Sequence, residues 1–192
     1  LDYDVKNLDY VNQREKMVYE KYFAVPKKNK VRGKIGINRS LTVNTLLPLY
    51  SKFFSELGYE VIIPENPAEE GMQKQSVAFC HPVGLSHGYI YDLLKNHKYD
   101  YIFLPHVKGL YVENGADESM LCPLAQAEPY YLAAVWPELK ADNVFSPVIN
   151  FQKGFLAAEE KFVDIALKLG LSKNKAKNAY QKAVEHQQQF KK

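Results

Sequence analysis

The sequence has few cysteines, no long apolar segment and none of the common nucleotide-binding motifs. Its 192 residues include only two cysteines, too few for the disulfide framework of a small secreted domain. The longest apolar stretches, 99–104 and 144–151, end well short of the roughly 18 residues needed to span a bilayer. Neither a G-x-G-x-x-G loop after a strand nor a P-loop is present, which argues against NAD binding and against a phosphate cradle. We therefore expect a cytoplasmic protein with reduced thiols and no contact with a membrane.

The charge balance does not favour nucleic-acid binding either. The formal net charge is +3, and it comes mostly from scattered lysines and from one basic run over 27–34. Such a run before a first strand is usually a solvated linker, so we expect no nucleic-acid partner. The chain starts Leu-Asp-Tyr-Asp, with no initiator methionine and no signal region, which suggests a piece of a longer polypeptide.

The pattern of apolar residues predicts one α/β domain preceded by an arm. Residues 1–33 are polar and tyrosine-rich, and we expect a linker or helical arm there, with Val11, Val18 and Tyr22 on one side of a helix over 11–23. Residues 34–192 then form a single domain. In that domain, strands are predicted at 34–38, 59–64, 99–104 and 143–151, with Pro147 at an edge, a bulge or the end of the last one.

Helices are predicted between these strands at 44–57, 83–96 and 125–136, and two more follow at 155–169 and 173–190. Gly58 and Gly170 are expected to end the helices at 44–57 and 155–169, and Ser172 is expected to be the N-cap of the last helix. Strands that alternate with single helices require crossover connections, which place helices on both faces of the sheet. The sequence thus predicts a Rossmann-like, mainly parallel sheet flanked by helices, with C-terminal helices closing the domain.

In such a sheet, ligands bind beyond the carboxyl ends of the strands. Four loops qualify, at 38–40, 76–87, 105–106 and 120–123. Arg39 could grip a carboxylate or a phosphate with its two-pronged guanidinium group. His87 is expected near the start of a helix, where free N–H groups favour an anion, and His106 closes the third strand. We take these three residues as candidate ligand-binding residues, although solvated or core positions would also suit them.

Cys80 and Cys122 lie in two of these loops. In both loops, the cysteine ends an apolar stretch and a proline follows closely. Three interpretations remain open from the residues alone. A free cysteine is most often an inert, buried side chain. A thiolate beside a base could be a nucleophile, and a thiolate held by a neighbouring proline could bind a metal or an iron–sulfur cluster. Zinc or a cluster needs about four ligands, so further donors would have to come from outside this chain.

The order of several segments resembles one family. The resemblance covers nearly everything after Val31 and rests on the succession of segments more than on one short motif. The segments are Arg32-Gly33-Lys34-Ile35-Gly36-Ile37-Asn38-Arg39, the stretch from Phe53 to Val61, Ser76-Val77-Ala78-Phe79-Cys80 with His87-Gly88, Tyr99 into Pro105, Cys122-Pro123 with Pro129-Tyr130, Ser146-Pro147-Val148-Ile149 and Ala179-Tyr180. The chain is similar to the domain of unknown function in the large activators of 2-hydroxyacyl-CoA (2-hydroxyglutaryl-CoA) dehydratases, the CoA-substrate-specific enzyme activase-related proteins.

The resemblance implies a module of a long cytoplasmic protein that also carries ATPase domains and a dehydratase-like region. Such activators use ATP to drive a low-potential electron through a [4Fe–4S] cluster into the dehydratase. Cys80 and Cys122 match cysteine positions of the family, so the resemblance makes them candidate cluster ligands in the full-length protein. We expect an accessory domain that supports this electron transfer and is not catalytic alone. The alternatives are a structural or protein-interaction domain with inert cysteines, and an acyl-CoA-binding lobe.

Overall fold

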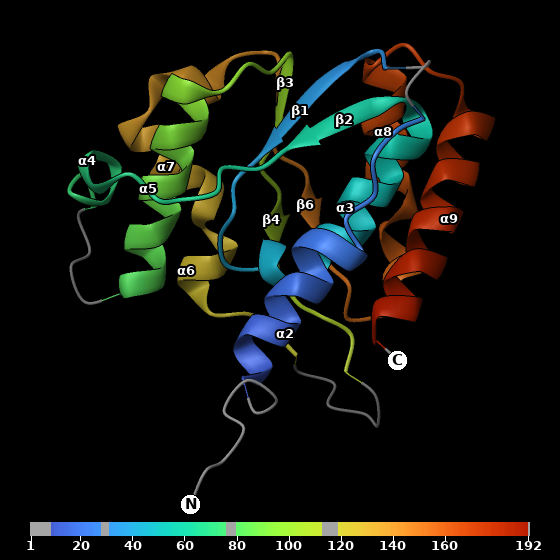
Figure 1. Ribbon diagram of the computed structural model, residues 1–192. Coiled ribbons are helices and arrows are strands. Elements are labelled where there is room, and N and C mark those ends of the chain that lie inside the picture. The colour runs from blue at the N-terminus through green and yellow to red at the C-terminus, as the bar shows by residue number, and fades with distance from the viewer. Residues whose placement is uncertain (1–8, 28–30, 76–79, 113–118, 192) are drawn as a thin grey trace, which may run out of the picture.

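The computed structural model describes residues 9–27, 31–75, 80–112 and 119–191 (Figure 1). Its helices and strands in chain order are α2 (Tyr10–Lys16), η1 (Met17–Lys21), β1 (Gly33–Ile37), α3 (Val43–Leu57), β2 (Tyr59–Ile62), α4 (Glu69–Met72), α5 (His81–Asn96), β3 (Tyr101–Phe103), β4 (His106–Val107), α6 (Pro123–Gln126), α7 (Glu128–Val135), η3 (Pro137–Lys140), β5 (Val144–Phe145), β6 (Val148–Ile149), η4 (Phe155–Ala158), α8 (Glu159–Lys168) and α9 (Lys173–Lys191). None of these helices is long and apolar enough to cross a membrane.

Four strands form a parallel sheet in the order β2-β1-β3-β5. The predicted α/β class with a mainly parallel sheet is therefore confirmed. Beyond this sheet, β4 pairs with β6 in parallel. Backbone hydrogen bonds continue from the β3–β5 pair to the β4–β6 pair: the N–H of Leu104 donates to the carbonyl oxygen of Phe145 at 2.9 Å, and that of His106 donates to the carbonyl oxygen of Pro147 at 2.9 Å.

Pro147 explains why β5 and β6 are separate strands. Its carbonyl oxygen faces β4, and in an extended strand the nitrogen of the same residue faces the same way. Because proline has no N–H to donate, one rung of the ladder is missing at that point. The fourth strand predicted over 143–151 is thus two short strands on the outer side of the sheet.

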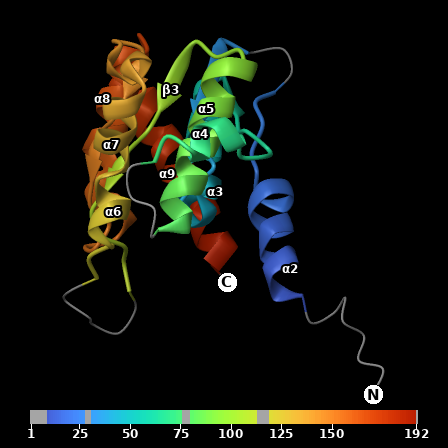
Figure 2. The same cartoon turned by 90° about the vertical axis from the view of Figure 1, so that its left-hand side faces the viewer.

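The sheet separates two apolar cores, and side chains on β3 alternate between them. Tyr101 and Phe103 join the larger core, while Ile102 and Leu104 join the smaller one. This alternation follows from the two-residue period of a strand. Helices α3, α8 and α9 cover the face with the larger core, and α5 and α7 cover the other face (Figures 1 and 2).

Gly36 allows α5 to approach β1 closely. A Cβ atom at this position would lie 3.1 Å from the terminal carbons of Leu93, which packs onto the strand from α5. The neighbouring Ile35 and Ile37 point into the other core, where both are fully buried. The glycine in the first predicted strand therefore serves packing rather than a turn.

A proline interrupts the hydrogen-bond ladder of α3, and the last helix repairs it. Pro48 leaves the carbonyl of Asn44 without its usual donor. The next rung of the ladder, between the carbonyl of Thr45 and the N–H of Leu49, is bridged by the side-chain amide of Gln187 in α9, which donates to Thr45 at 2.9 Å and accepts from Leu49 at 3.0 Å. Gln187 is fully buried, so it completes α3 from inside the core.

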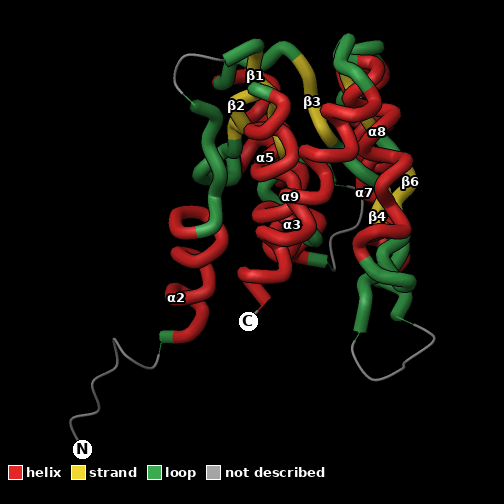
Figure 3. The backbone as a smooth tube through the Cα atoms, turned by 90° about the vertical axis from the view of Figure 1, so that its right-hand side faces the viewer, coloured by secondary structure: helices red, strands yellow, loops and turns green. Residues whose placement is uncertain are grey.

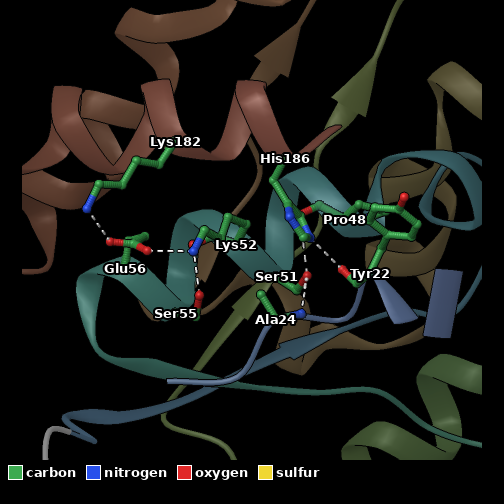
Figure 4. A network of polar contacts seen from close by, with 9 residues as sticks. All are labelled: Tyr22, Ala24, Pro48, Ser51, Lys52, Ser55, Glu56, Lys182 and His186. Atoms are coloured by element: carbon green, nitrogen blue, oxygen red, sulfur yellow. Dashed lines mark hydrogen bonds and ion pairs between the residues drawn. The ribbon is translucent and has the colours of Figure 1, made fainter. Parts of the chain in front are cut away.

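The arm before β1 lies against α3 and α9. Val18 in η1 is 1% exposed and belongs to the larger core. His186 donates from Nε2 to the carbonyl oxygen of Tyr22 over 2.9 Å, and the N–H of Ala24 donates to Oγ of Ser51 over 3.1 Å (Figure 4). Residues 18–24 of the arm are therefore anchored to the helices of one layer.

The helix expected over 11–23 starts and ends close to the expected positions, since α2 and η1 together cover Tyr10–Lys21. The expected apolar side is different, because Val11 is 80% exposed while Val18 is buried. Val11 lies in α2, which has no buried residue, whereas Val18 lies in the π-helical segment η1, which packs against the core.

Candidate functional site

The carboxyl edge of the sheet has a switch point between β1 and β3. From β1 the chain passes through α3 to β2 on one side, and it returns through α5 to β3 on the other. Because α3 and α5 cover opposite faces of the sheet, the loops that lead into these two helices diverge at this point. A crevice of this kind is where open α/β sheets usually bind ligands. The candidate site therefore lies among the residues at this edge.

Cys80 and Cys122 occupy equivalent local positions. Cys80 is the N-cap residue of α5 and is partly exposed, and Cys122 is the N-cap residue of α6 and is exposed. Pro82 and Pro123 lie in the first turns of these helices, where a missing N–H costs nothing. The prolines that suggested metal-binding loops are thus residues of the first helical turns. Both thiols are free and neither is buried in a core.

Tyr131 in α7 has a pKa that both thiols influence. Burial is the main reason why the pKa of Tyr131 is raised well above its usual value, and Glu128, Cys80 and Cys122 each raise it further. Both cysteines are N-cap residues of helices that start at the same end of the sheet (Figure 1).

A buried polar cluster lies beside the cysteines. Glu128, the first residue of α7, accepts hydrogen bonds at Oε1 from Asn38 Nδ2 at 2.9 Å, from Ser86 Oγ at 2.6 Å and from Ser40. Asn38 and Ser40 follow β1, and Ser86 lies in α5. All four residues are at most 3% exposed. The cluster therefore connects the end of β1 to the two helices that follow the cysteine loops.

Burial raises the pKa of the Glu128 carboxyl, and the hydrogen bonds from Ser40, Ser86 and Asn38 only partly oppose this effect. A buried carboxyl group that holds its proton is neutral, so it can remain in the interior without a cationic partner. The Oδ1 atom of Asn38 is buried and has no protein partner in the described part of the chain. The cluster thus holds an unused hydrogen-bond acceptor at the switch point.

The two candidate histidines lie at the sides of this region. His87 is in the interior of α5, since the helix starts two residues earlier than predicted, and its ring is 2% exposed and stacked on Tyr131 at 5.4 Å. Burial lowers its pKa. His106 in β4 is 7% exposed, and its Nδ1 atom lies 3.2 Å from the carbonyl oxygen of Gln126 in α6. Burial also lowers the pKa of His106, and the bond to Gln126 partly opposes this.

Arg39 lies apart from the cysteines. It lines a pocket beneath α2, and neither cysteine nor His87 is among the described residues that line this pocket. Its guanidinium forms an ion pair with Glu15 of α2 and donates to the carbonyl oxygen of Glu65 at 3.2 Å. The carboxyl edge therefore has two separate regions, one around the thiols and one around Arg39.

The thiols provide two donors for a metal or a cluster. Among the described residues, no group of three or more His, Cys, Asp or Glu side chains could hold a metal ion. Residues 76–79 of the predicted 76–87 loop lie outside the described residues, as do 1–8 of the predicted arm, 28–30 of the basic run and 113–118 of the loop before Cys122. The described donor set thus fits half of the usual four-ligand cluster site.

Sequence reasoning found the loop that carries Asn38 and Ser40 but missed their partners Ser86 and Glu128. An acidic residue at the start of a helix normally faces water and stabilises the helix dipole. Glu128 had this ordinary pattern, and nothing in its neighbours indicated burial. A signal could only have come from the three-dimensional path of α7, which turns the first residue of the helix towards β1.

Comparison with known proteins gives one match. No curated protein and no solved structure matches the chain. A family model described as the CoA enzyme activase uncharacterised domain matches residues 34–192, from the second residue of β1 to the C-terminus. This range contains the sheet apart from Gly33, both cysteines and the polar cluster, but not the arm. The chain therefore belongs to the CoA enzyme activase domain family.

Proposed function

We propose that this is an accessory domain of a 2-hydroxyacyl-CoA dehydratase activator, and that it supports ATP-driven, low-potential electron transfer to the dehydratase. In this role, Cys80 and Cys122 are two thiolate ligands of a [4Fe–4S] cluster in the full-length protein. The observation that carries the proposal is that both free thiols belong to N-cap residues of helices that start at the carboxyl edge of the sheet. Membership of the activase family supports it.

The remaining ligands come from outside this chain. An iron–sulfur cluster takes about four protein ligands, mostly cysteines, and this sequence has two cysteines in all. The exposure of Cys122 is consistent with a site completed by another domain or by the dehydratase. When bound, the cluster would supply one-electron chemistry, and the role of this chain is to position two thiolates. The ATPase domains of the same protein and the dehydratase are the expected partners.

Reconstitution of the full-length activase protein with iron and sulfide, without oxygen, tests this proposal. We expect Cys80→Ser and Cys122→Ser each to lower the bound iron and the visible charge-transfer absorption relative to the unmodified protein. Met120→Leu, two residues before Cys122, is the matched control and should retain both signals. Equal iron content and equal absorption in both cysteine variants would leave a structural or interaction domain with inert cysteines as the better assignment.

A further inference from the structure

A pocket of about 650 Å³ lies between α2 and the carboxyl ends of β1 and β2. Pockets of this size typically hold small molecules, and this edge of a parallel sheet is where such ligands bind. The charged residues among the described lining are Arg39, from the loop after β1, Lys16 of α2, and the glutamates Glu15, Glu20 and Glu65. Apolar side chains line another part of the pocket, including Val61, Ile63 and Phe23.

Arg39 is held much more tightly than a surface arginine. Its side chain is 16% exposed, and its guanidinium carbon lies 4.0 Å from the ring centre of Tyr19. One terminal nitrogen bonds the Glu15 carboxylate and the other bonds the carbonyl oxygen of Glu65. An arginine that is stacked on an aromatic ring and partly desolvated is a strong carboxylate receptor. The carboxylate that occupies it here belongs to the protein's own arm.

The segment that supplies Glu15 is attached more weakly than the rest of the arm. Helix α2 contains no buried residue, whereas η1 contributes Val18 to the core. Contacts of α2 with the domain include the Glu15 ion pair and a 3.1 Å hydrogen bond from Arg14 to Thr45. In Figures 2 and 3, α2 lies at the periphery, outside the helix layers. A segment with few buried contacts opens at low free-energy cost.

The π-helical geometry of η1 lies at the junction between the weak and the anchored parts. Its residues, Met17–Lys21, separate α2 from the Tyr22 and Ala24 anchors. Single π-helical turns are rare and are often found at functional sites. The arm therefore has a loosely held end, α2, and an anchored base that begins with the irregular turn η1.

We infer that the pocket at Arg39 is a binding site for a small carboxylate, and that α2 is a displaceable cover whose Glu15 occupies the place of the ligand's acidic group. The ligand's carboxylate would replace that of Glu15 on Arg39, and its aliphatic part would contact Val61 and Ile63. One ion pair with Arg39 replaces another, and no covalent bond is made or broken in this exchange. The site is independent of the cluster proposed above, because neither cysteine lines the pocket.

Glutarate is the appropriate probe because its chain ends in the same carboxylate as a glutamate side chain. Calorimetric titration of this chain should show that Glu15→Gln binds glutarate at least about tenfold more tightly than the unmodified protein. Arg39→Gln, added to that variant, should remove this gain. Glu138→Gln, which cancels an exposed ion pair with Lys95, is the matched control and should bind glutarate like the unmodified protein. Neutral glutaramide should not bind.

Two results of this titration would overturn the inference. The first is equal glutarate affinity of Glu15→Gln and the unmodified protein, with the melting temperatures confirming that both are folded. The second is phosphate binding to Glu15→Gln as tight as that of glutarate, which would exclude a site selective for carboxylates.

Hydrogen exchange of the unmodified protein provides a test that requires no substitution. Saturating glutarate should speed up amide exchange across Tyr10–Lys16, because the ligand and Glu15 compete for Arg39. Exchange over the anchored residues 18–24 should remain unchanged. Binding of glutarate with unchanged or slower exchange in α2 would contradict displacement of the cover.

Discussion

Replacing Gln187 with leucine should lower the free energy of unfolding by about 3 kcal/mol. The leucine fills a similar volume but leaves the carbonyl of Thr45 and the N–H of Leu49 without their partners. Each buried backbone group that loses its hydrogen bond costs roughly 1–3 kcal/mol, and the proline at position 48 prevents α3 from shifting its ladder to compensate. Urea unfolding, monitored by circular dichroism, measures the change.

Gln188→Leu is the matched control, since the neighbouring glutamine on α9 is exposed. This substitution should change the stability by less than about 0.5 kcal/mol. If the two variants had the same stability, the bridge from Gln187 to α3 would have no energetic role.

Replacing Glu128 with alanine should destabilise the domain by about 3 kcal/mol at pH 5. The variant removes the buried acceptor that Asn38, Ser40 and Ser86 share. Asn38 Nδ2 keeps its contacts with Ser40 and Ser86, so the main loss falls on the two hydroxyl groups. Unsatisfied buried donors of this kind cost roughly 1–3 kcal/mol each, and the loss is reduced where water can enter. Denaturant unfolding at pH 5 measures it, and a change below about 0.5 kcal/mol would contradict the assigned role.

The pH dependence of the same position has a definite sign. Because burial raises the pKa of Glu128 in the folded state, the folded state binds the proton more tightly than the unfolded state does. The stability that this proton contributes is fully present below the pKa of Glu128 in the unfolded state. It is lost as the pH rises through the pKa of Glu128 in the folded state. Glu128→Gln, which stays neutral, should therefore gain stability relative to the unmodified protein between pH 5 and pH 8. A constant difference would show that Glu128 ionises at its usual pKa, and an opposite one would show that its pKa is lowered; either result would contradict the prediction.

The sequence allowed the alternation of strands and helices to be predicted because each element has a strong local signal. Buried strands such as β1 are short apolar runs, and α3 has apolar residues at helical spacing and ends at Gly58, which has a φ of 95°. These patterns act over a few residues, so one sequence shows them. The place of Pro147 on the outermost strand also followed from the chemistry of a single residue.

The features that hold the site together could not be predicted in this way. Glu128 and Ser86 are 42 residues apart, and Arg39 and Glu15 are 24 residues apart. Whether a polar side chain finds such a partner depends on the packing of whole elements, which leaves no periodic trace in the sequence. His87 shows the same limit on a smaller scale, because a two-residue change in the start of α5 moves it from a helix end to the interior.

The bridge from Gln187 to α3 also constrains the order in which the chain folds. Its two hydrogen bonds join residues separated by 138 and 142 positions. During synthesis, α3 emerges long before α9, so its second turn remains incomplete until nearly the whole domain has been made. Contacts that distant in sequence also slow folding, because a large loop must close before they form. The first helix of this domain thus depends on the last, and shortening the chain before residue 187 would leave the N-terminal half without a stable native structure.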